Sequence, residues 1–280
     1  VGEGWYLHEF GPQADAGSET GAWPTRSELG LADAQRELVR RVHEETDTPV
    51  VPVLVTGRPL AVEWIAEHAP ALLLAYFPGT EGGVAVAETL FGENDPSGRL
   101  PVSVPRDAGD LPQHHDHLVH PTPIGDDEHP ASYDPLFAFG HGLSYTEFET
   151  DEPTAAVDPD DGTVRVRVAV TNVGDRAGTE TVQVYARQTH ASRVRPVHSL
   201  VGFDRVTLAP GETATVAVVV PIARLGFYKP REGHVVEAAD YRFDVGGEST
   251  TITLSAETVD ATLADGEAAE AAAASPEPND

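Results

Sequence analysis

The chain has 280 residues, which is enough for two domains of ordinary size that each bury a core of their own. It carries 46 acidic and 18 basic residues, a net charge of -28, and its one lysine is Lys229. This charge argues against a nucleic-acid partner, which needs a basic face. The absence of cysteine excludes disulfides, thiolate nucleophiles and thiolate metal ligands.

An acidic surface that keeps arginine and nearly eliminates lysine favours a protein of a halophilic organism. At about 1 M salt the Debye length falls to roughly 3 Å, so repulsion among the acids is screened. An acidic protein of an ordinary cytosol is the alternative. The longest apolar runs, such as residues 69–77, are far shorter than the ~20 residues of a membrane span. We therefore expect no membrane partner, and a high-salt cytoplasm in preference to secretion.

Residues 1–110 alternate strand and helix patterns, which predicts a mostly parallel α/β sandwich of three layers. The expected strands are the end of a buried strand at Val1-Gly2-Glu3 and the apolar runs 50–55 and 71–77. The expected helices cover residues 35–42, 62–68 and 82–90. The first helix places Leu38, Val39 and Val42 on one side. Since no apolar run precedes Glu3, we expect the first strand to be cut and this domain to be truncated at its N-terminus.

Residues 111–150 form a connector rich in Pro, His and Asp, and the pattern then changes. Residues 151–255 alternate apolar and polar positions, for example Val164, Val166, Val168 and Val170, and turn signals separate the runs. Further strands are expected at 182–186, 214–220, 241–245 and 250–254. This part predicts an antiparallel β-sandwich. Residues 256–280 contain acids, alanines and no bases, which predicts a disordered tail.

Several long motifs resemble one enzyme family. They are Thr56-Gly57-Arg58-Pro59-Leu60, residues 76–83 (YFPGTEGG), residues 90–101 (LFGENDPSGRLP), residues 135–146 (PLFAFGHGLSYT), residues 171–175 (TNVGD), residues 200–203 (LVGF) and residues 208–213 (LAPGET). In this order they are similar to the C-terminal α/β domain and the fibronectin type III-like domain of glycoside hydrolase family 3. The β-glucosidases and β-xylosidases of the family are the most similar. The resemblance extends over residues 1–255.

The resemblance implies a retaining glycosidase without a cofactor, acting on a carbohydrate such as a β-glucoside or a related oligosaccharide. Family members begin with a (β/α)8 barrel that carries the aspartate nucleophile and most groups of the first sugar subsite. The chain contains no such barrel, so the resemblance implies a fragment that needs a barrel partner in cis or in trans. In many members the second domain supplies the general acid/base, on the loop after a strand of the Val-Gly-Glu type.

The resemblance therefore assigns Glu3, in Val1-Gly2-Glu3, as the general acid/base, with Glu9 on the same loop as the runner-up. An ordinary exposed glutamate is the alternative for Glu3. Trp5, Tyr6 and Trp23 follow on this loop and form a possible stacking surface for a sugar, or they pack onto the barrel.

Two polar residues after the next strands have structural interpretations. We expect Arg58 to hold a turn in preference to binding a sugar. We expect Glu81 to cap the helix that begins at Gly82, where an acid complements the helix dipole.

Histidines cluster in the connector at His114, His115, His117, His120 and His129. Imidazoles on a loop can bind a metal ion. This segment has neither cysteine nor a rigid frame, so no metal site is expected.

A non-catalytic carbohydrate-associated or degenerate module, expressed from a broken gene, is the second hypothesis. The DNA upstream of Val1 separates the two, because an in-frame or frameshifted barrel there supports the glycosidase.

The β-sandwich should be the more stable part of the chain, because the α/β domain lacks at least one central strand and its covering helix. Chemical denaturation should show two transitions, with the sandwich unfolding last. Cooperative unfolding of the whole chain in one step would contradict this prediction.

Overall fold

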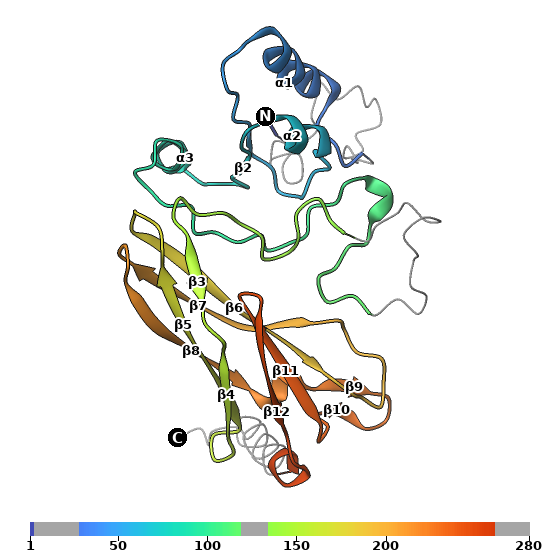
Figure 1. The fold of residues 1–280 in the computed structure, drawn as a ribbon. Helices are drawn as coiled ribbons and strands as arrows, with labels where there is room; N and C mark the ends of the chain where they lie inside the picture. Colours follow the sequence, from blue (N-terminus) through green and yellow to red (C-terminus); the bar gives the residue numbers. More distant parts are fainter. Residues whose placement is uncertain (3–27, 119–133, 261–280) are drawn as a thin grey trace, which may run out of the picture. The chain divides into compact units, whose positions relative to one another are not determined.

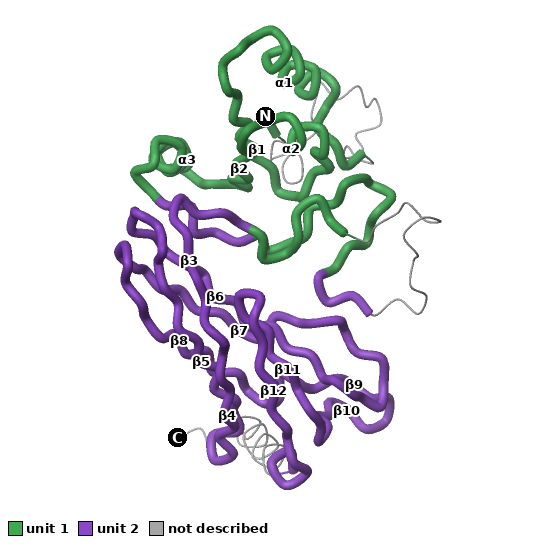
Figure 2. The backbone as a smooth tube through the Cα atoms, in the orientation of Figure 1, with its two compact units in different colours: residues 1–94, 100–114, 125–141 green, residues 95–99, 115–124, 142–280 purple. Residues whose placement is uncertain are grey.

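The computed structural model describes residues 1–2, 28–118 and 134–260, and the chain forms two compact units (Figures 1 and 2). The first unit consists of Val1–Asn94, Leu100–His114 and Gly125–His141. The second consists of Asp95–Arg99, His115–Ile124 and Gly142–Asp280. The chain therefore passes between the two units several times.

The first unit is an α/β structure. In chain order its elements are α1 (Asp33–Glu45), β1 (Val53–Leu54), α2 (Glu63–His68), β2 (Leu73–Leu74), α3 (Gly82–Leu90) and the short 3-10 helix η2 (Ala108–Asp110). Strands β1 and β2 pair in parallel, with Val53 opposite Leu73, and α2 forms the connection between them. This β-α-β order confirms the α/β class predicted for this part of the chain.

The core of this unit is small. It consists of Leu31, Val39, Leu54, Leu60, Val62 and Ile65. Helix α1 contributes only Val39, whereas Leu38 is 57% exposed and Val42 is 38% exposed. Of the three residues expected on one side of this helix, only Val39 is therefore buried. Consecutive residues of an α-helix differ by about 100° in direction, so Leu38 points away when Val39 faces the core.

The second unit is an all-β sandwich, as predicted. Its strands are β3 (Phe148–Thr150), β4 (Thr154–Asp158), β5 (Thr163–Asn172), β6 (Gly178–Gln188), β7 (Ser199–Leu208), β8 (Thr213–Pro221), β9 (Phe227–Lys229), β10 (Gly233–Val235), β11 (Asp240–Val245) and β12 (Glu248–Thr253). One sheet has the order β12-β11-β6-β7. In the other, β3 and β4 pair with β5, and β8 also pairs with β5. A 3-10 helix, η3 (Ile222–Leu225), follows β8.

The long strands alternate apolar and polar residues, and their apolar side chains form the sandwich core. Val164, Val166, Val168 and Val170 are each at most 3% exposed, which confirms the buried face predicted for β5. The largest buried side chains opposite them, Tyr241 and Phe243, come from β11. Residues 256–260 are helical and Val259 is buried in the same core, so packing continues beyond residue 255, where the tail was expected to begin. No helix among the described residues is long and apolar enough to cross a membrane.

Asp95 helps to hold the segment Asp95–Arg99 in the sandwich unit. Its carboxylate accepts hydrogen bonds from Ser144 Oγ at 2.8 Å, from the Tyr145 N–H at 2.8 Å and from the Thr179 N–H at 3.0 Å. Burial raises the pKa of Asp95, but these three hydrogen bonds and nearby Arg176 outweigh burial, so the pKa lies below its ordinary value.

The loop between β10 and β11 carries a second carboxylate, that of Glu237, which lies in a hydrogen-bond network. It accepts hydrogen bonds from Gln188 Nε2 at 2.9 Å and from both Ser192 groups, and its Oε1 lies 2.7 Å from Lys229 Nζ. Burial raises the pKa of Glu237, but the hydrogen bonds from Lys229, Ser192 and Gln188 together lower it from 4.5 to about 2.

Glu237 should therefore make the stability of the sandwich pH-dependent. A folded-state pKa below the unfolded value means that the contribution is complete above about pH 4.5 and is lost as the pH falls towards 2. Urea unfolding at several pH values, followed by circular dichroism, measures the effect.

Glu237→Gln should flatten this part of the pH profile. Glu248→Gln removes the same charge from an exposed position and is the control, which should keep the slope of the unsubstituted chain. Equal slopes for the two variants would contradict the role assigned to Glu237.

Candidate functional site at the carboxyl edge of the parallel strands

The first unit brings three strand ends together at one edge. Val1 and Gly2 lie beside β1: the Val55 N–H donates to Val1 O at 3.0 Å, and Gly2 forms a parallel bridge with Val55. On the other side of β1, the Ala75 N–H donates to Leu54 O at 2.9 Å. Ligands of open α/β sheets bind at the carboxyl ends of the strands, so this edge is the candidate site.

Gly2 is the tightest contact at this edge. Its φ is +152°, and a Cβ atom built on it would lie 1.8 Å from Val55 O. No side chain fits there without separation of the two backbones. The pairing therefore depends on glycine at position 2.

Among the described residues, the outer side of Gly2 is bonded to a side chain. The Gly2 N–H donates to Gln35 Oε1 at 2.7 Å, and Gln35 Nε2 donates to Gly2 O at 2.9 Å. The carboxamide of Gln35, in the first turn of α1, thus replaces a neighbouring strand. The sequence analysis missed this role, since a glutamine on a helix carries no signal for it.

The turn after β1 is built from Thr56, Gly57 and Arg58. Thr56 is buried; its hydroxyl accepts from the Arg58 N–H and donates to Arg58 O. A Cβ atom on Gly57 would lie 2.6 Å from the ring of Phe77. Arg58 Nη2 donates to Glu28 O at 2.7 Å, which supports the structural interpretation of this arginine.

Tyr76 follows β2 at the same edge and was also missed. Its backbone has a φ of +50°, which is uncommon for a residue other than glycine, and its O accepts from the Thr56 N–H at 3.2 Å. Its hydroxyl is buried and has no hydrogen-bond partner among the described residues. Burial raises the pKa of this phenol, so it stays protonated and remains a donor. No sequence pattern signals a positive φ at a tyrosine.

The predicted site residues Glu3, Trp5, Tyr6, Glu9 and Trp23 lie outside the described residues, and their roles remain predictions. The described residue next to Glu3 is Gly2, at the edge where the chemistry is expected.

Glu81 stands at the N-cap of α3, as expected, but its side chain makes no capping hydrogen bond. Its charge still lies at the favourable end of the helix.

Among the described histidines of the connector, His115 makes ring contacts in the sandwich unit. The rings of His115 and His198 lie 6.3 Å apart, and the ring of His198 lies 5.0 Å from that of Tyr185. No group of three or more metal-ligating side chains is close enough to hold an ion in the part of the chain that the structure describes. His120 and His129 lie outside that part.

Comparisons with known proteins agree with both units. Residues 10–145 match the family model described as "Glycosyl hydrolase family 3 C-terminal domain", and residues 180–249 match the model described as "Fibronectin type III-like domain". The chain carries the C-terminal domain of glycosyl hydrolase family 3.

The relatives of this family 3 chain are much longer than the chain itself. It is 37% identical to a periplasmic β-glucosidase of Salmonella typhimurium and 39% identical to a β-xylosidase of Formosa agariphila. These alignments cover 81% and 80% of the chain, but 31% of each relative. The chain therefore spans about a third of their length.

Solved structures give the same result. A β-glucosidase from Erythrobacter marinus matches with a TM-score of 0.74 and 37% identity, over 81% of this chain and 31% of that one. A β-glucosidase from Listeria innocua, solved in complex with glucose, matches with a TM-score of 0.72 and 33% identity, over 81% of this chain and 34% of that one.

Gly2→Ala should separate the backbone of residue 2 from that of Val55 at the candidate edge. The added Cβ must displace Val55, and loss of the local backbone hydrogen bonds should cost at least about 2 kcal/mol. Urea unfolding followed by tryptophan fluorescence measures this, because Trp64 packs against the core of the first unit.

Gly83→Ala is the matched control. An added Cβ meets nothing within 4 Å there, and the residue lies in α3, so the variant should be neutral or more stable by roughly 0.5–1 kcal/mol. Equal stability of the two variants would show that the Gly2 contact is not required.

Proposed function

We propose that this chain is the C-terminal part of a retaining β-glycosidase of the β-glucosidase type, hydrolysing O-glycosidic bonds of β-glucosides or related oligosaccharides. The observation that carries the proposal is the alignment of about four-fifths of the chain, across both units, with β-glucosidases and a β-xylosidase. Because the chain spans about a third of these relatives, the activity is proposed for its assembly with a (β/α)8 barrel, in cis or in trans.

In this proposal the two catalytic carboxylates come from different parts of the assembly. The barrel supplies the nucleophile and this chain supplies Glu3 as general acid/base, with Glu9 as the runner-up. The pairing of Gly2 with Val55 supports Glu3, because the next residue along the chain then begins at the carboxyl edge of the sheet. Gln35 and Val55 act as positioning residues for this backbone.

The chemistry requires two steps. In the first, the barrel carboxylate attacks the anomeric carbon while protonated Glu3 donates its proton to the leaving oxygen. In the second, Glu3 takes a proton from water, which hydrolyses the covalent glycosyl-enzyme. Carboxyl groups about 5–5.5 Å apart fit this double displacement. A partly buried acid beside a second carboxylate has a raised pKa, which keeps it protonated near neutral pH.

Two further parts of the proposal concern the substrate and the solvent. Trp5, Tyr6 and Trp23 are proposed to stack against the sugar, since aromatic rings offer large apolar faces. The net charge of -28 supports work in concentrated salt, where screening removes much of the repulsion among the acids. A high-salt cytoplasm is the proposed location.

Joining this chain to a (β/α)8 barrel, if its upstream coding region encodes one, tests the proposal, with Glu3→Gln and Glu9→Gln as a matched pair. Glu3→Gln should lower kcat/KM for an alkyl β-glucoside by about 10²–10⁴-fold, because its poor leaving group needs the acid. The loss should be much smaller for a dinitrophenyl glucoside, which leaves without protonation. Glu9→Gln should stay close to the unsubstituted enzyme for both substrates.

Loss of activity in Glu9→Gln alone would transfer the role to Glu9. An upstream region without a barrel, or an assembly without β-glycosidase activity in molar KCl, would favour a non-catalytic carbohydrate-associated module. This chain alone should not hydrolyse an aryl β-glucoside, since it lacks the proposed nucleophile.

A further inference from the structure

Residues 115–118 of the connector lie against the sandwich, and they belong to the sandwich unit. Leu118 forms an antiparallel bridge with Pro196, and the Val197 N–H donates to His117 O at 2.9 Å. The residues just before them, Leu100–His114, belong to the α/β unit. These backbone contacts therefore attach the connector to the loop before β7, and we call them the connector contact.

Two histidines and a tyrosine pack together at the connector contact. The ring of His198, the residue before β7, lies 5.0 Å from the ring of Tyr185 in β6 and 6.3 Å from the ring of His115. The rings of His115 and Tyr185 lie 6.4 Å apart. All three side chains are partly buried. A histidine of the connector thus meets a histidine of the sandwich across the contact.

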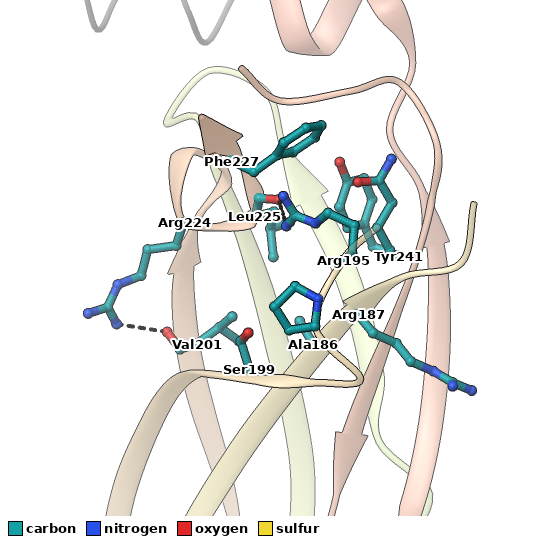
Figure 3. Close-up of a pocket in the computed structure, with 12 residues that line it drawn as sticks. Ala186, Arg187, Arg195, Ser199, Val201, Arg224, Leu225, Phe227 and Tyr241 are labelled. Atoms are coloured by element: carbon teal, nitrogen blue, oxygen red, sulfur yellow. Dashed lines mark hydrogen bonds between the residues drawn. The ribbon is translucent and has the colours of Figure 1, made fainter. Parts of the chain in front are cut away.

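The contact lies on the outer face of the sheet that contains β6. Ala186 is 5% exposed and belongs to the sandwich core, so its neighbours Tyr185 and Arg187 point to the opposite face. Figure 3 shows Arg187 directed away from the other labelled residues around a small cavity of the sandwich. Opposite Tyr185 in β11 is Asp244, whose carboxylate accepts from Arg242 Nε at 2.7 Å. The outer face thus places several charges near His198.

These surroundings favour the neutral form of His198. Partial burial is the main cause, because a charged imidazole loses hydration there. Positive charge on His115, His117 and Arg187 acts in the same direction. The pKa of His198 therefore lies below its ordinary value of 6.5. The phenol of Tyr185 stays neutral, since burial raises its pKa.

Two carboxylates oppose this effect without reversing it. Asp244 raises the pKa of His198, but its charge is already paired with Arg242. The Asp116 carboxylate lies 4.0 Å from His115 Nδ1 and is 50% exposed, so solvent weakens its attraction. A second proton at the contact is thus poorly compensated.

We propose that the connector contact is a pH-sensitive switch, which holds residues 115–118 on the sandwich at neutral pH and releases them as His198 and His115 gain protons. Two charged rings 6.3 Å apart repel each other, and release separates them and returns both to water. Histidine suits this role, because its ordinary titration lies close to neutral pH. The switch is independent of the proposed glycosidase function, since the contact lies within the sandwich unit.

The direction of the switch follows from the pKa of His198. This pKa is lowered in the attached state, so attachment is complete above about pH 6.5 and weakens as the pH falls below that value. Glu237 acts at lower pH, because its contribution is lost only below about pH 4.5. The two effects are therefore separable.

Hydrogen exchange of the full chain measures the switch at one amide. The Val197 N–H is bonded across the connector contact, whereas the Thr189 N–H donates to Asp240 O at 2.9 Å at the end of β6 and is the internal control. Between about pH 7.5 and 5.5, at one KCl concentration, the protection factor of Val197 should fall by at least about threefold. The protection factor of Thr189 should stay constant.

His198→Gln removes the titrating ring and should remove most of the fall at Val197. His234→Gln removes an exposed histidine of β10 in the same unit and is the matched control, which should keep the fall.

Four results would overturn the proposal. They are a constant protection factor at Val197, an equal fall at Thr189, an unchanged fall in His198→Gln, and loss of the fall in His234→Gln. If His198→Gln does not fold, the ring resonances of His198 in the unsubstituted chain decide. Their titration midpoint should coincide with the midpoint of the fall at Val197, and different midpoints would exclude the switch.

Discussion

The candidate site depends on one close approach between two backbones, that of Gly2 and Val55. Glycine at position 2 allows parallel pairing, and this pairing fixes where the first strand ends relative to β1 and β2. The turn after β1 and the strained backbone at Tyr76 then meet at the same edge, joined by the Thr56–Tyr76 hydrogen bond. Because these contacts are mostly main-chain ones, the geometry of the edge is insensitive to most side-chain changes around it. The side-chain exceptions are the Gln35 carboxamide, which bonds the outer side of Gly2, and the Thr56 hydroxyl in the turn after β1.

The sandwich, in contrast, is stabilised mainly by contacts of side chains: apolar burial and a few carboxylates. Valines and two large aromatic residues supply the core, and buried or partly buried acids hold the irregular segments. Asp95 binds two backbone N–H groups and a hydroxyl, while Glu180 pairs with Arg99 at 2.6 Å. Each acid is compensated by donors, as a buried charge requires. Some acids of this strongly negative chain thus hold its own segments together.

The sequence predicted those parts of the fold that have a strict period. Strand β5 alternates without interruption, and α3 begins at its glycine pair, so both were expected close to their observed bounds. Strand β7 was not predicted as a strand, because Gly202 and exposed Phe203 break its alternation and the pairing with β6 shifts at Val184/Tyr185. The support from Gln35 and the positive φ of Tyr76 could not be predicted either. Each depends on segments brought together only by the tertiary fold, or on a backbone angle that carries no signature.

Because the chain passes between the two units several times, it constrains the order in which they can fold during synthesis. Residues 95–99 leave the ribosome between two parts of the α/β unit, yet their partners Ser144, Thr179 and Arg205 are synthesised later. The α/β unit must likewise wait for residues 134–141, whose Phe137 pairs with Val104. The α/β unit can therefore complete its folding only after residue 141, and the segment 95–99 is held only once the sandwich strands that bind it have been made. A gene that exchanged only a contiguous piece, cut between residues 99 and 142, would separate Asp95 from the sandwich, so the two units are expected to be inherited together.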